Sequence, residues 1–123
     1  MSAEIYRIAP RAAWAEAKAI GRYSGAPHDR ADGFIHFSYA DQVLATAQKH
    51  YADQRDLVIV AVRAADLGDA LKAEPSRGGA LFPHLYAALP TAAATRVAAL
   101  PDAPEDRAQA LTAFLAQAAP AKP

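Results

Sequence analysis

The chain has 123 residues, of which 53% are hydrophobic and 21% are charged; this predicts one globular domain with a single core rather than a disordered chain. Because 13 basic side chains balance 13 acidic ones, nucleic acid is disfavoured as the main partner, since such a partner usually requires a basic excess. There is no cysteine, which excludes disulfides, thiolate catalysis and cysteine-bound metal centres.

Targeting and membrane signals are missing from the sequence. The first seven residues lack the basic and apolar regions of a signal peptide. No apolar run approaches the roughly 18 residues that a transmembrane helix needs. These features predict a cytoplasmic protein without a membrane partner. We expect residues 1–118 to form a single domain and residues 119–123, which contain only Ala, Pro and Lys, to be a flexible tail.

The first third of the chain is predicted to contain a strand, a helix and a loop. Residues 4–8 alternate as a short strand. A helix is expected from about Pro10, a residue tolerated in the first helical turn, to Gly21, with Trp14 as its core anchor. Residues 22–31 are rich in Gly, Pro, Ser and Asp, which predicts a loop.

The segment from residue 32 to residue 38, Asp-Gly-Phe-Ile-His-Phe-Ser, is predicted to be the strand around which the fold is organised. In a strand, Phe34, His36 and Ser38 share one face. A histidine in the middle of an otherwise apolar strand is unusual, and it predicts a cleft centred on that side chain. We expect Gly33 to mark a turn and Ser38 to cap the helix that follows.

Three further strands and a helix complete the predicted elements. Residues 56–63 form an apolar run without alternation, which indicates a strand buried on both faces of a sheet. Shorter strands are expected at residues 70–74 and 95–100. Pro83 favours an extended conformation of the residue before it, Phe82. The final helix is expected to begin near Glu105.

No strong catalytic motif is present: the chain has no phosphate-binding glycine loop, no nucleophile elbow and no zinc-binding helix motif. What remains is a set of polar residues within apolar segments. His36 and Ser38 would stand about 7 Å apart on one strand face, so both can contact one ligand. Histidine serves as donor, acceptor or general acid–base near neutral pH. His84 and Tyr86 form a second pair, and Glu74 can orient a ribose or act as a base.

Structural explanations compete with each functional one. A core histidine bonded to the backbone explains His36, and an aromatic cluster explains His84 and Tyr86. His50 suits the last turn of a helix, where a cation interacts well with the helix dipole. A metal site built from His28, His36, His84 and a nearby Asp matches no recognised ligand spacing, so no metal is expected.

The order of several short motifs resembles a known family. Ile-Tyr-Arg-Ile near the start, Trp14, Asp-Gly-Phe-Ile-His-Phe-Ser, Leu-Val-Ile-Val and Phe-Pro-His-Leu-Tyr are similar to the bacterial domain of unknown function 952, up to about Leu100. The resemblance implies an α+β fold with an ADP-ribosyltransferase-like split sheet, mixed or antiparallel, flanked by helices. Superfamily members that act on NAD bind it in a cleft between two small, mostly antiparallel sheets.

The resemblance also implies roles for individual residues. Arg7 stands where the family commonly has His, and a guanidinium suits oxyanions such as phosphate. Ala87 replaces the glycine that usually follows Leu-Tyr, which narrows the approach of a ligand. The expected catalytic residues are His36, Glu74 and His84, and the expected cofactor-binding residues are Arg7, Ser38 and Tyr86.

The leading hypothesis is a domain that binds a nucleotide-type small molecule, with activity resembling an ADP-ribosyltransferase or a phosphotransferase. The residues alone identify no cofactor; NAD is the one that the resemblance implies. The first alternative is a non-enzymatic small-ligand-binding or regulatory domain. A divalent-metal hydrolase and a purely structural role for both His36 and His84 are the further alternatives.

Overall fold

The computed structural model describes residues 3–117, and its strands pair in three antiparallel sheets. The first sheet has the order β1-β4-β8, the second the order β3-β6-β5, and the third pairs β2 with β7. The strand bounds are β1 Glu4–Pro10, β2 Arg22–Tyr23, β3 Ile35–His36, β4 Leu57–Arg63, β5 Leu71–Pro75, β6 Leu81–Leu85, β7 Leu89–Pro90 and β8 Ala94–Leu100.

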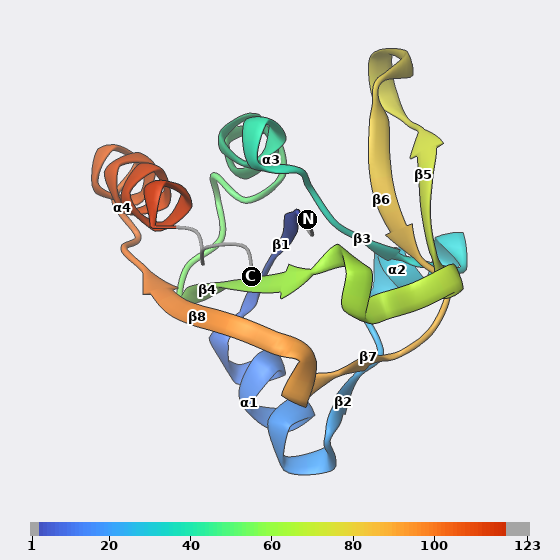
Figure 1. Cartoon of the computed structure of the whole chain (residues 1–123). Coiled ribbons are helices and arrows are strands. Elements are labelled where there is room, and N and C mark those ends of the chain that lie inside the picture. The colour runs from blue at the N-terminus through green and yellow to red at the C-terminus, as the bar shows by residue number, and fades with distance from the viewer. Residues whose placement is uncertain (1–2, 118–123) are drawn as a thin grey trace.

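The helices cover both faces of the β1-β4-β8 sheet, with α3 and α4 on one side and α1 on the other (Figure 1). Their bounds are α1 Arg11–Ile20, α2 Pro27–Asp32, α3 Val43–His50 and α4 Pro104–Ala116, with 3₁₀ turns at Ala40–Gln42, Ala64–Ala70, Arg77–Gly79 and Thr91–Ala93. Within residues 3–117, none of the helices combines the length and apolar character that crossing a membrane requires. The predicted α+β class with antiparallel sheets and flanking helices is confirmed.

Strand β4 is the centre of the core, as its apolar run predicts. Val58, Val60 and Val62 face a hydrophobic cluster that includes Trp14. The alternate residues face a second cluster that includes Leu111 of α4. Each face of the strand therefore has its own core, because successive side chains point to opposite sides of a sheet.

An isolated bridge joins the first two sheets. Tyr6 of β1 forms an isolated antiparallel bridge with Ser38, just beyond β3. Its two backbone hydrogen bonds run from Tyr6 N to Ser38 O at 2.9 Å and from Ser38 N to Tyr6 O at 2.8 Å. Within residues 3–117, this bridge is the only strand pairing between the β1-β4-β8 and β3-β6-β5 sheets.

The prediction of a loop over residues 22–31 is wrong. Residues Arg22–Tyr23 form β2, and Pro27–Asp32 form the short helix α2, with Pro27 in its first turn. A helix of six residues is too short to show hydrophobic periodicity, so the Gly and Pro signals dominate the sequence pattern.

The strand predicted over residues 32–38 is also shorter than expected. Asp32 belongs to α2, and Gly33 ends that helix in a left-handed conformation with a φ of 87°. Only Ile35–His36 pair with β6. Ser38 does not cap the next helix: its Oγ lies 3.2 Å from the Thr46 Oγ1, and the turn at Ala40–Gln42 instead begins after Tyr39.

Other boundaries agree with the sequence. Helix α1 follows Pro10 and ends at Gly21, whose φ is 101°. Trp14 is buried, as its role of core anchor requires. Strand β8 and helix α4 begin within one residue of their predicted starts. The predicted tail at residues 119–123 lies outside the described residues.

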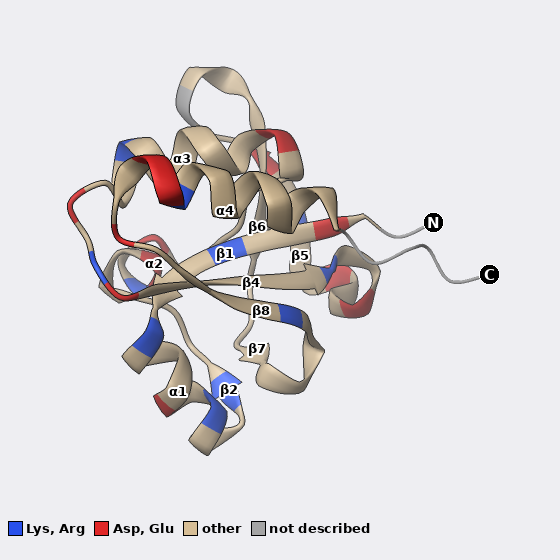
Figure 2. Cartoon of the chain, turned by 90° about the vertical axis from the view of Figure 1, so that its left-hand side faces the viewer, with Lys and Arg blue, Asp and Glu red and all other residues tan. Residues whose placement is uncertain are grey.

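Charged residues of both signs are dispersed over the ribbon and, in the view of Figure 2, form no continuous basic stripe among residues 3–117. This agrees with the absence of net charge.

Candidate functional site: a cavity lined by four histidines

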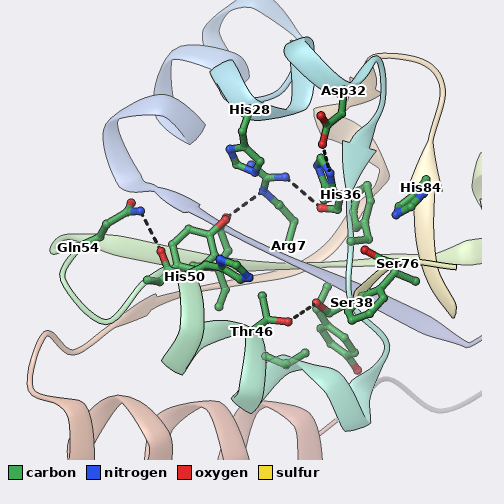
Figure 3. A pocket seen from close by; sticks show the side chains of 16 residues that line it. Arg7, His28, Asp32, His36, Ser38, Thr46, His50, Gln54, Ser76 and His84 are labelled. Carbon is green, nitrogen blue, oxygen red and sulfur yellow. Dashed lines mark hydrogen bonds and ion pairs between the residues drawn. The ribbon is translucent and has the colours of Figure 1, made fainter. Parts of the chain in front are cut away.

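A cavity of about 560 Å³ lies where the two larger sheets diverge, and all four histidines of the chain line it (Figure 3). They come from four different elements: His28 from α2, His36 from β3, His50 from α3 and His84 from β6. Its volume is within the usual range for small-molecule sites, about 300–1,000 Å³. Other polar or charged residues that line it are Arg7, Asp32, Ser38, Thr46, Gln54 and Ser76.

One wall of the cavity is built on a buried ion pair between Arg7 and Asp29. The two residues are only 4% and 1% exposed. The guanidinium donates from Nη1 to Asp29 Oδ1 and from Nη2 to Asp29 Oδ2, both at 2.7 Å. Its Nε donates to the Ile8 carbonyl, and Nη1 also donates to the His36 carbonyl. The pair therefore ties β1 to α2 and β3, and most of the donors of Arg7 are already used.

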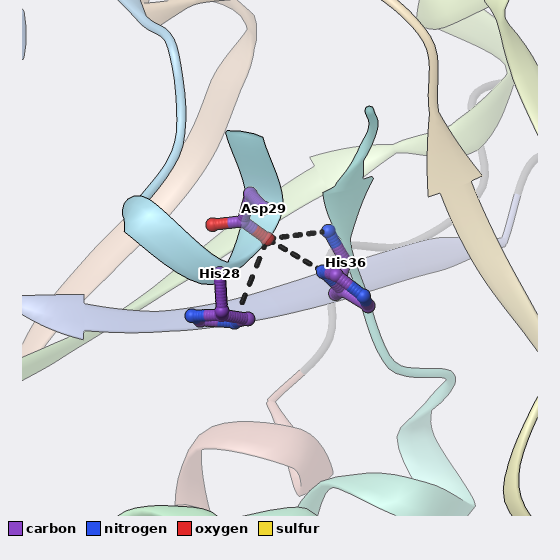
Figure 4. A group of neighbouring side chains, drawn as sticks. All are labelled: His28, Asp29 and His36. Atoms are coloured by element: carbon purple, nitrogen blue, oxygen red, sulfur yellow. Dashed lines mark hydrogen bonds and ion pairs between the residues drawn. The ribbon is translucent and has the colours of Figure 1, made fainter. Parts of the chain in front are cut away.

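Asp29 is the point at which three elements meet (Figure 4). Besides Arg7, its carboxylate accepts the backbone N–H groups of Ala26 and His36, and Oδ1 lies 2.7 Å from the His36 Nδ1. Burial by itself raises the pKa of Asp29, but the hydrogen bonds from His36 and Arg7 outweigh it and hold the pKa well below its ordinary value. Asp29 is therefore a carboxylate that accepts hydrogen bonds and does not donate them.

The His36 ring is held between two carboxylates. Its Nδ1 faces Asp29, and its Nε2 lies 2.9 Å from Asp32 Oδ2. Its side chain is 30% exposed. Since a carboxylate only accepts hydrogen bonds, both contacts are satisfied together when both ring nitrogens carry a proton. The two carboxylates, both from α2, thereby hold the His36 ring in place against the cavity.

The second histidine of the sheet, His84, lies directly opposite His36 in the β3–β6 pair. Its Nδ1 is 2.8 Å from Glu74 Oε1, and the same oxygen accepts the Tyr86 hydroxyl at 2.7 Å. The hydrogen bonds from Tyr86 and then from His84 lower the pKa of Glu74. Glu74 itself comes from β5, next to β6, so the group is assembled across a strand pair.

Aromatic packing fixes the position of both imidazoles. The Phe34 ring stacks on His84, with centroids 4.0 Å apart and an interplanar angle of 22°. It also lies 4.6 Å from the His36 ring and 5.2 Å from the Tyr86 ring. The His36 and His84 rings are 5.5 Å apart, edge to face. Phe34 therefore acts as the common packing partner of three residues that the sequence had singled out.

The opposite wall of the cavity is formed from helix α3 and the segment after it. Thr46 and His50 are one turn apart on α3, and Gln54 follows the helix. The Gln54 amide donates to the His50 carbonyl at 3.3 Å. Ser38 joins this wall through its contact with Thr46. This side of the cavity offers hydroxyl, amide and imidazole groups to a ligand.

One group of side chains has metal-ligand chemistry: His28, Asp29 and His36, whose ligand atoms lie within 4.8 Å of one another. Three donors already occupy Asp29 Oδ1, namely the Arg7 guanidinium and the backbone and ring nitrogens of His36. A divalent cation there would displace these donors and lie beside the guanidinium charge. The geometry therefore disfavours the metal-hydrolase alternative, because a cation so close to Arg7 is repelled.

The residues predicted from the sequence fall into two groups. Arg7, His36, Ser38 and His84 line the cavity. Glu74 and Tyr86 are not lining residues but stand behind His84 and contact each other and its ring. Asp32 and His50 also line the cavity but were not among the predicted catalytic or cofactor-binding residues, and neither were Asp29 and Phe34, which contact the two central histidines. Asp29 and Asp32 are seven and four residues before His36, on the other side of Gly33, and a short helix recognised at Pro27 would have placed them.

The comparisons with known proteins agree with this fold. The family model described as "Protein of unknown function (DUF952)" matches residues 8–97. Two crystal structures of protein CC0527 from Caulobacter crescentus, one of them of a double mutant, are 49% and 48% identical to the chain. Each has a TM-score of 0.85 and is matched over 92% of this chain and 98% of its own.

A solution structure of the same Caulobacter protein gives a TM-score of 0.76 at 48% identity, over 86% of this chain and 91% of its own. No curated protein matches the chain. The matched residues 8–97 include all four histidines that line the cavity. The chain belongs to the family of proteins of unknown function known as DUF952.

Proposed function

We propose that the cavity binds a small phosphorylated ligand of nucleotide type, for which NAD and ADP-ribose are the specific candidates. The observation that carries the proposal is the convergence of every histidine in the chain, from four separate elements, on one cavity. Histidines needed only for packing would have no reason to gather at one solvent-accessible site.

Imidazole and hydroxyl groups suit a phosphate. The side chain of His28 is 58% exposed at one end of the cavity, and His50 lines the wall opposite. Ser38, Thr46 and Ser76 add hydroxyl groups that can donate to phosphate oxygens. Hydrogen bonds to a charged group contribute about 1.5–3 kcal/mol each, so a few of them give useful affinity.

The size and the aromatic surface of the cavity suit the rest of a nucleotide. Its volume of about 560 Å³ can hold a nucleoside and a phosphate together. Tyr6, Phe37, Tyr51 and Phe82 are among its lining residues, and aromatic rings pack well against planar bases. The position of the cavity beside the junction of two antiparallel sheets supports the ADP-ribosyltransferase-like analogy, which itself remains part of the proposal.

The role of Arg7 in this proposal differs from the simplest version of the analogy. Its guanidinium is engaged with Asp29, so it does not present a free fork to a phosphate. Arg7 instead holds Asp29 and the His36 carbonyl in place. Arg7 thus stabilises the residues that form the site, while the imidazole and hydroxyl groups contact the ligand.

Isothermal titration calorimetry with NAD, ADP-ribose, ADP and inorganic phosphate tests the proposal. We expect at least one nucleotide to bind and a His50→Ala variant to bind it roughly 10- to 100-fold more weakly, the equivalent of one hydrogen bond to a charged group. Glu105→Gln, an exposed change on α4 away from the cavity, is the matched control and should bind as the wild type does. Absence of heat for all four compounds with folded wild-type protein would overturn the proposal.

A further inference from the structure

The ring of His84 is almost completely buried, yet only one of its nitrogens has a hydrogen-bond partner. Nδ1 lies 2.8 Å from Glu74 Oε1. Nε2 is buried and has no partner among residues 3–117. Buried polar atoms are nearly always paired, so an unpaired one demands an explanation. Because His84 is also a lining residue of the cavity, and its ring extends from β6 toward the interior in Figure 3, a bound ligand can supply the missing partner.

The contact with Glu74 determines which nitrogen of His84 carries the proton. Glu74 already accepts the Tyr86 hydroxyl, and a carboxylate can only accept from the ring as well. The proton of a neutral imidazole is therefore on Nδ1. Nε2 is left with a lone pair, which is the arrangement of a histidine that works as a base in carboxylate–histidine pairs.

His36 differs from His84 in the hydrogen bonding of its ring nitrogens, although the two rings are only 5.5 Å apart. Both nitrogens of His36 face carboxylates, those of Asp29 and Asp32. It therefore has no free lone pair to offer a ligand. Of the two histidines that the sequence made central, His84 therefore has a ring nitrogen left to accept a proton, whereas both ring nitrogens of His36 are already engaged.

We propose that Nε2 of His84 accepts a hydrogen bond, and in turnover the proton, from a hydroxyl group of the bound ligand. The ligand class is one that carries both a phosphate and a sugar hydroxyl. In the transfer the ligand O–H bond breaks, an N–H bond forms on Nε2, and the electron pair stays on the ligand oxygen. Glu74 compensates the charge of the resulting imidazolium. His84 is thus the catalytic residue, and Glu74 and Tyr86 are its positioning residues.

The packing around the ring agrees with this assignment. Phe34 stacks on one face of His84, and His36 meets the ring edge to face. Together with the Glu74 contact, these neighbours restrict rotation of the ring, so that Nε2 has one direction. Fixed orientation of a base is a large part of its effect, because proton transfer needs hydrogen-bond geometry.

Two-bond ¹H–¹⁵N correlation spectra of the ligand-free protein at pH 7 test the first half of the proposal. We expect His84 to show a protonated Nδ1 and an unprotonated Nε2. A His84 ring with its proton on Nε2, or with both nitrogens protonated, would overturn the proposal. This measurement needs no ligand, so it is independent of whether the proposed function is correct.

Two variants separate positioning from simple stability. In Glu74→Gln the amide N–H can donate to Nδ1, so the Nε2–H form of His84 should increase several-fold. Asp32→Asn is the matched control: it removes a charge beside His36, and it should leave the His84 signals unchanged. Equal effects of the two variants on His84 would contradict the role of Glu74. The backbone amide spectrum shows in each case whether the fold is retained.

Addition of ADP-ribose tests the second half, which rests on the proposed function. We expect the Nε2 resonance of His84 to shift toward the value of a hydrogen-bonded nitrogen as the ligand binds. Binding measured by calorimetry without any shift of that resonance would overturn the proposal while leaving the proposed function intact. Absence of binding with the expected ligand-free tautomers would overturn the proposed function and, with it, the hydroxyl as the proton source.

Discussion

His36 and His84 lie directly opposite one another across the antiparallel β3–β6 pair, and their ring centroids are 5.5 Å apart. They are 48 residues apart in the sequence, yet one aromatic ring, that of Phe34, packs against both. Their hydrogen bonds are different: His36 bonds to two carboxylates, whereas His84 bonds to one, and its Nε2 has no partner in the described part of the chain. Neighbouring histidines thus have separate chemistry because their surroundings differ.

The buried Arg7–Asp29 pair should be strongly coupled. We expect Arg7→Met and Asp29→Asn each to lower the free energy of unfolding by about 3–5 kcal/mol, because each leaves an uncompensated buried charge. The double variant should lose clearly less than the sum of the two. Urea denaturation of the four proteins gives the coupling energy.

The matched control for this pair is Arg11–Asp56, another two-bond Arg–Asp contact, which is about 60% exposed on each side. Because solvent screens it, Arg11→Met should leave the urea midpoint nearly unchanged. Strictly additive losses for Arg7 and Asp29, or an equal loss at Arg11, would contradict a stabilising buried pair.

Acid should destabilise the protein partly through Asp29. The pKa of this carboxyl is lower in the folded than in the unfolded chain, where it is about 3.9. Its contribution to stability is therefore fully present above about pH 4 and is lost as the pH falls below that value. The difference in unfolding free energy between the wild type and Asp29→Asn, followed by urea denaturation from pH 6 to pH 3, should shrink below pH 4. A constant difference over that range would show that Asp29 is not the group responsible.

Gly25 should resist substitution more than an ordinary left-handed glycine. Its φ is 97°, and a Cβ added there would lie 2.7 Å from the Cβ of Asp29. Gly78 has a φ of 70° with nothing within 4 Å, so Gly78→Ala should cost only the backbone strain of about 1–2 kcal/mol. Gly25→Ala should cost about 1–3 kcal/mol more, because Asp29 has to move. Thermal unfolding of both variants measures this difference, and equal losses would mean that Asp29 moves aside at little cost.

Tyr86 should report on Glu74. The hydrogen bond to Glu74 raises the pKa of the Tyr86 phenol above its ordinary value. In Glu74→Gln the negative charge is gone, so we expect the pKa of Tyr86 to fall. Titration of the tyrosine ¹³Cζ resonances by NMR measures this change. The pKa of Tyr23, which burial raises, should stay the same and is the internal control; an unchanged Tyr86 would show that the hydroxyl does not bond to Glu74 in solution.

Much of the fold follows from local sequence patterns. The run Leu57–Arg63 forms the central strand because its uninterrupted apolar residues, Leu-Val-Ile-Val-Ala-Val, fit a strand that is covered on both faces. Gly21 marks the end of α1, because glycine readily adopts the left-handed conformation that ends a helix. Pro104 marks the start of α4, because proline fixes φ at a helical value and is tolerated in the first turn. These are properties of single residues and their neighbours, so they can be read without knowing the rest of the structure.

The candidate site depended more on tertiary structure. Sequence pattern alone singled out His36 and His84 as polar residues in apolar strands, and it directed attention to Arg7 and Glu74. Only the folded chain decided that Arg7 is paired with Asp29, 22 residues away, and that His50 faces the same cavity as His28. The physical reason is that a hydrogen-bond partner is set by the packing of separate elements, through α2 and the strand pairs. No local propensity encodes which two side chains from distant segments will meet.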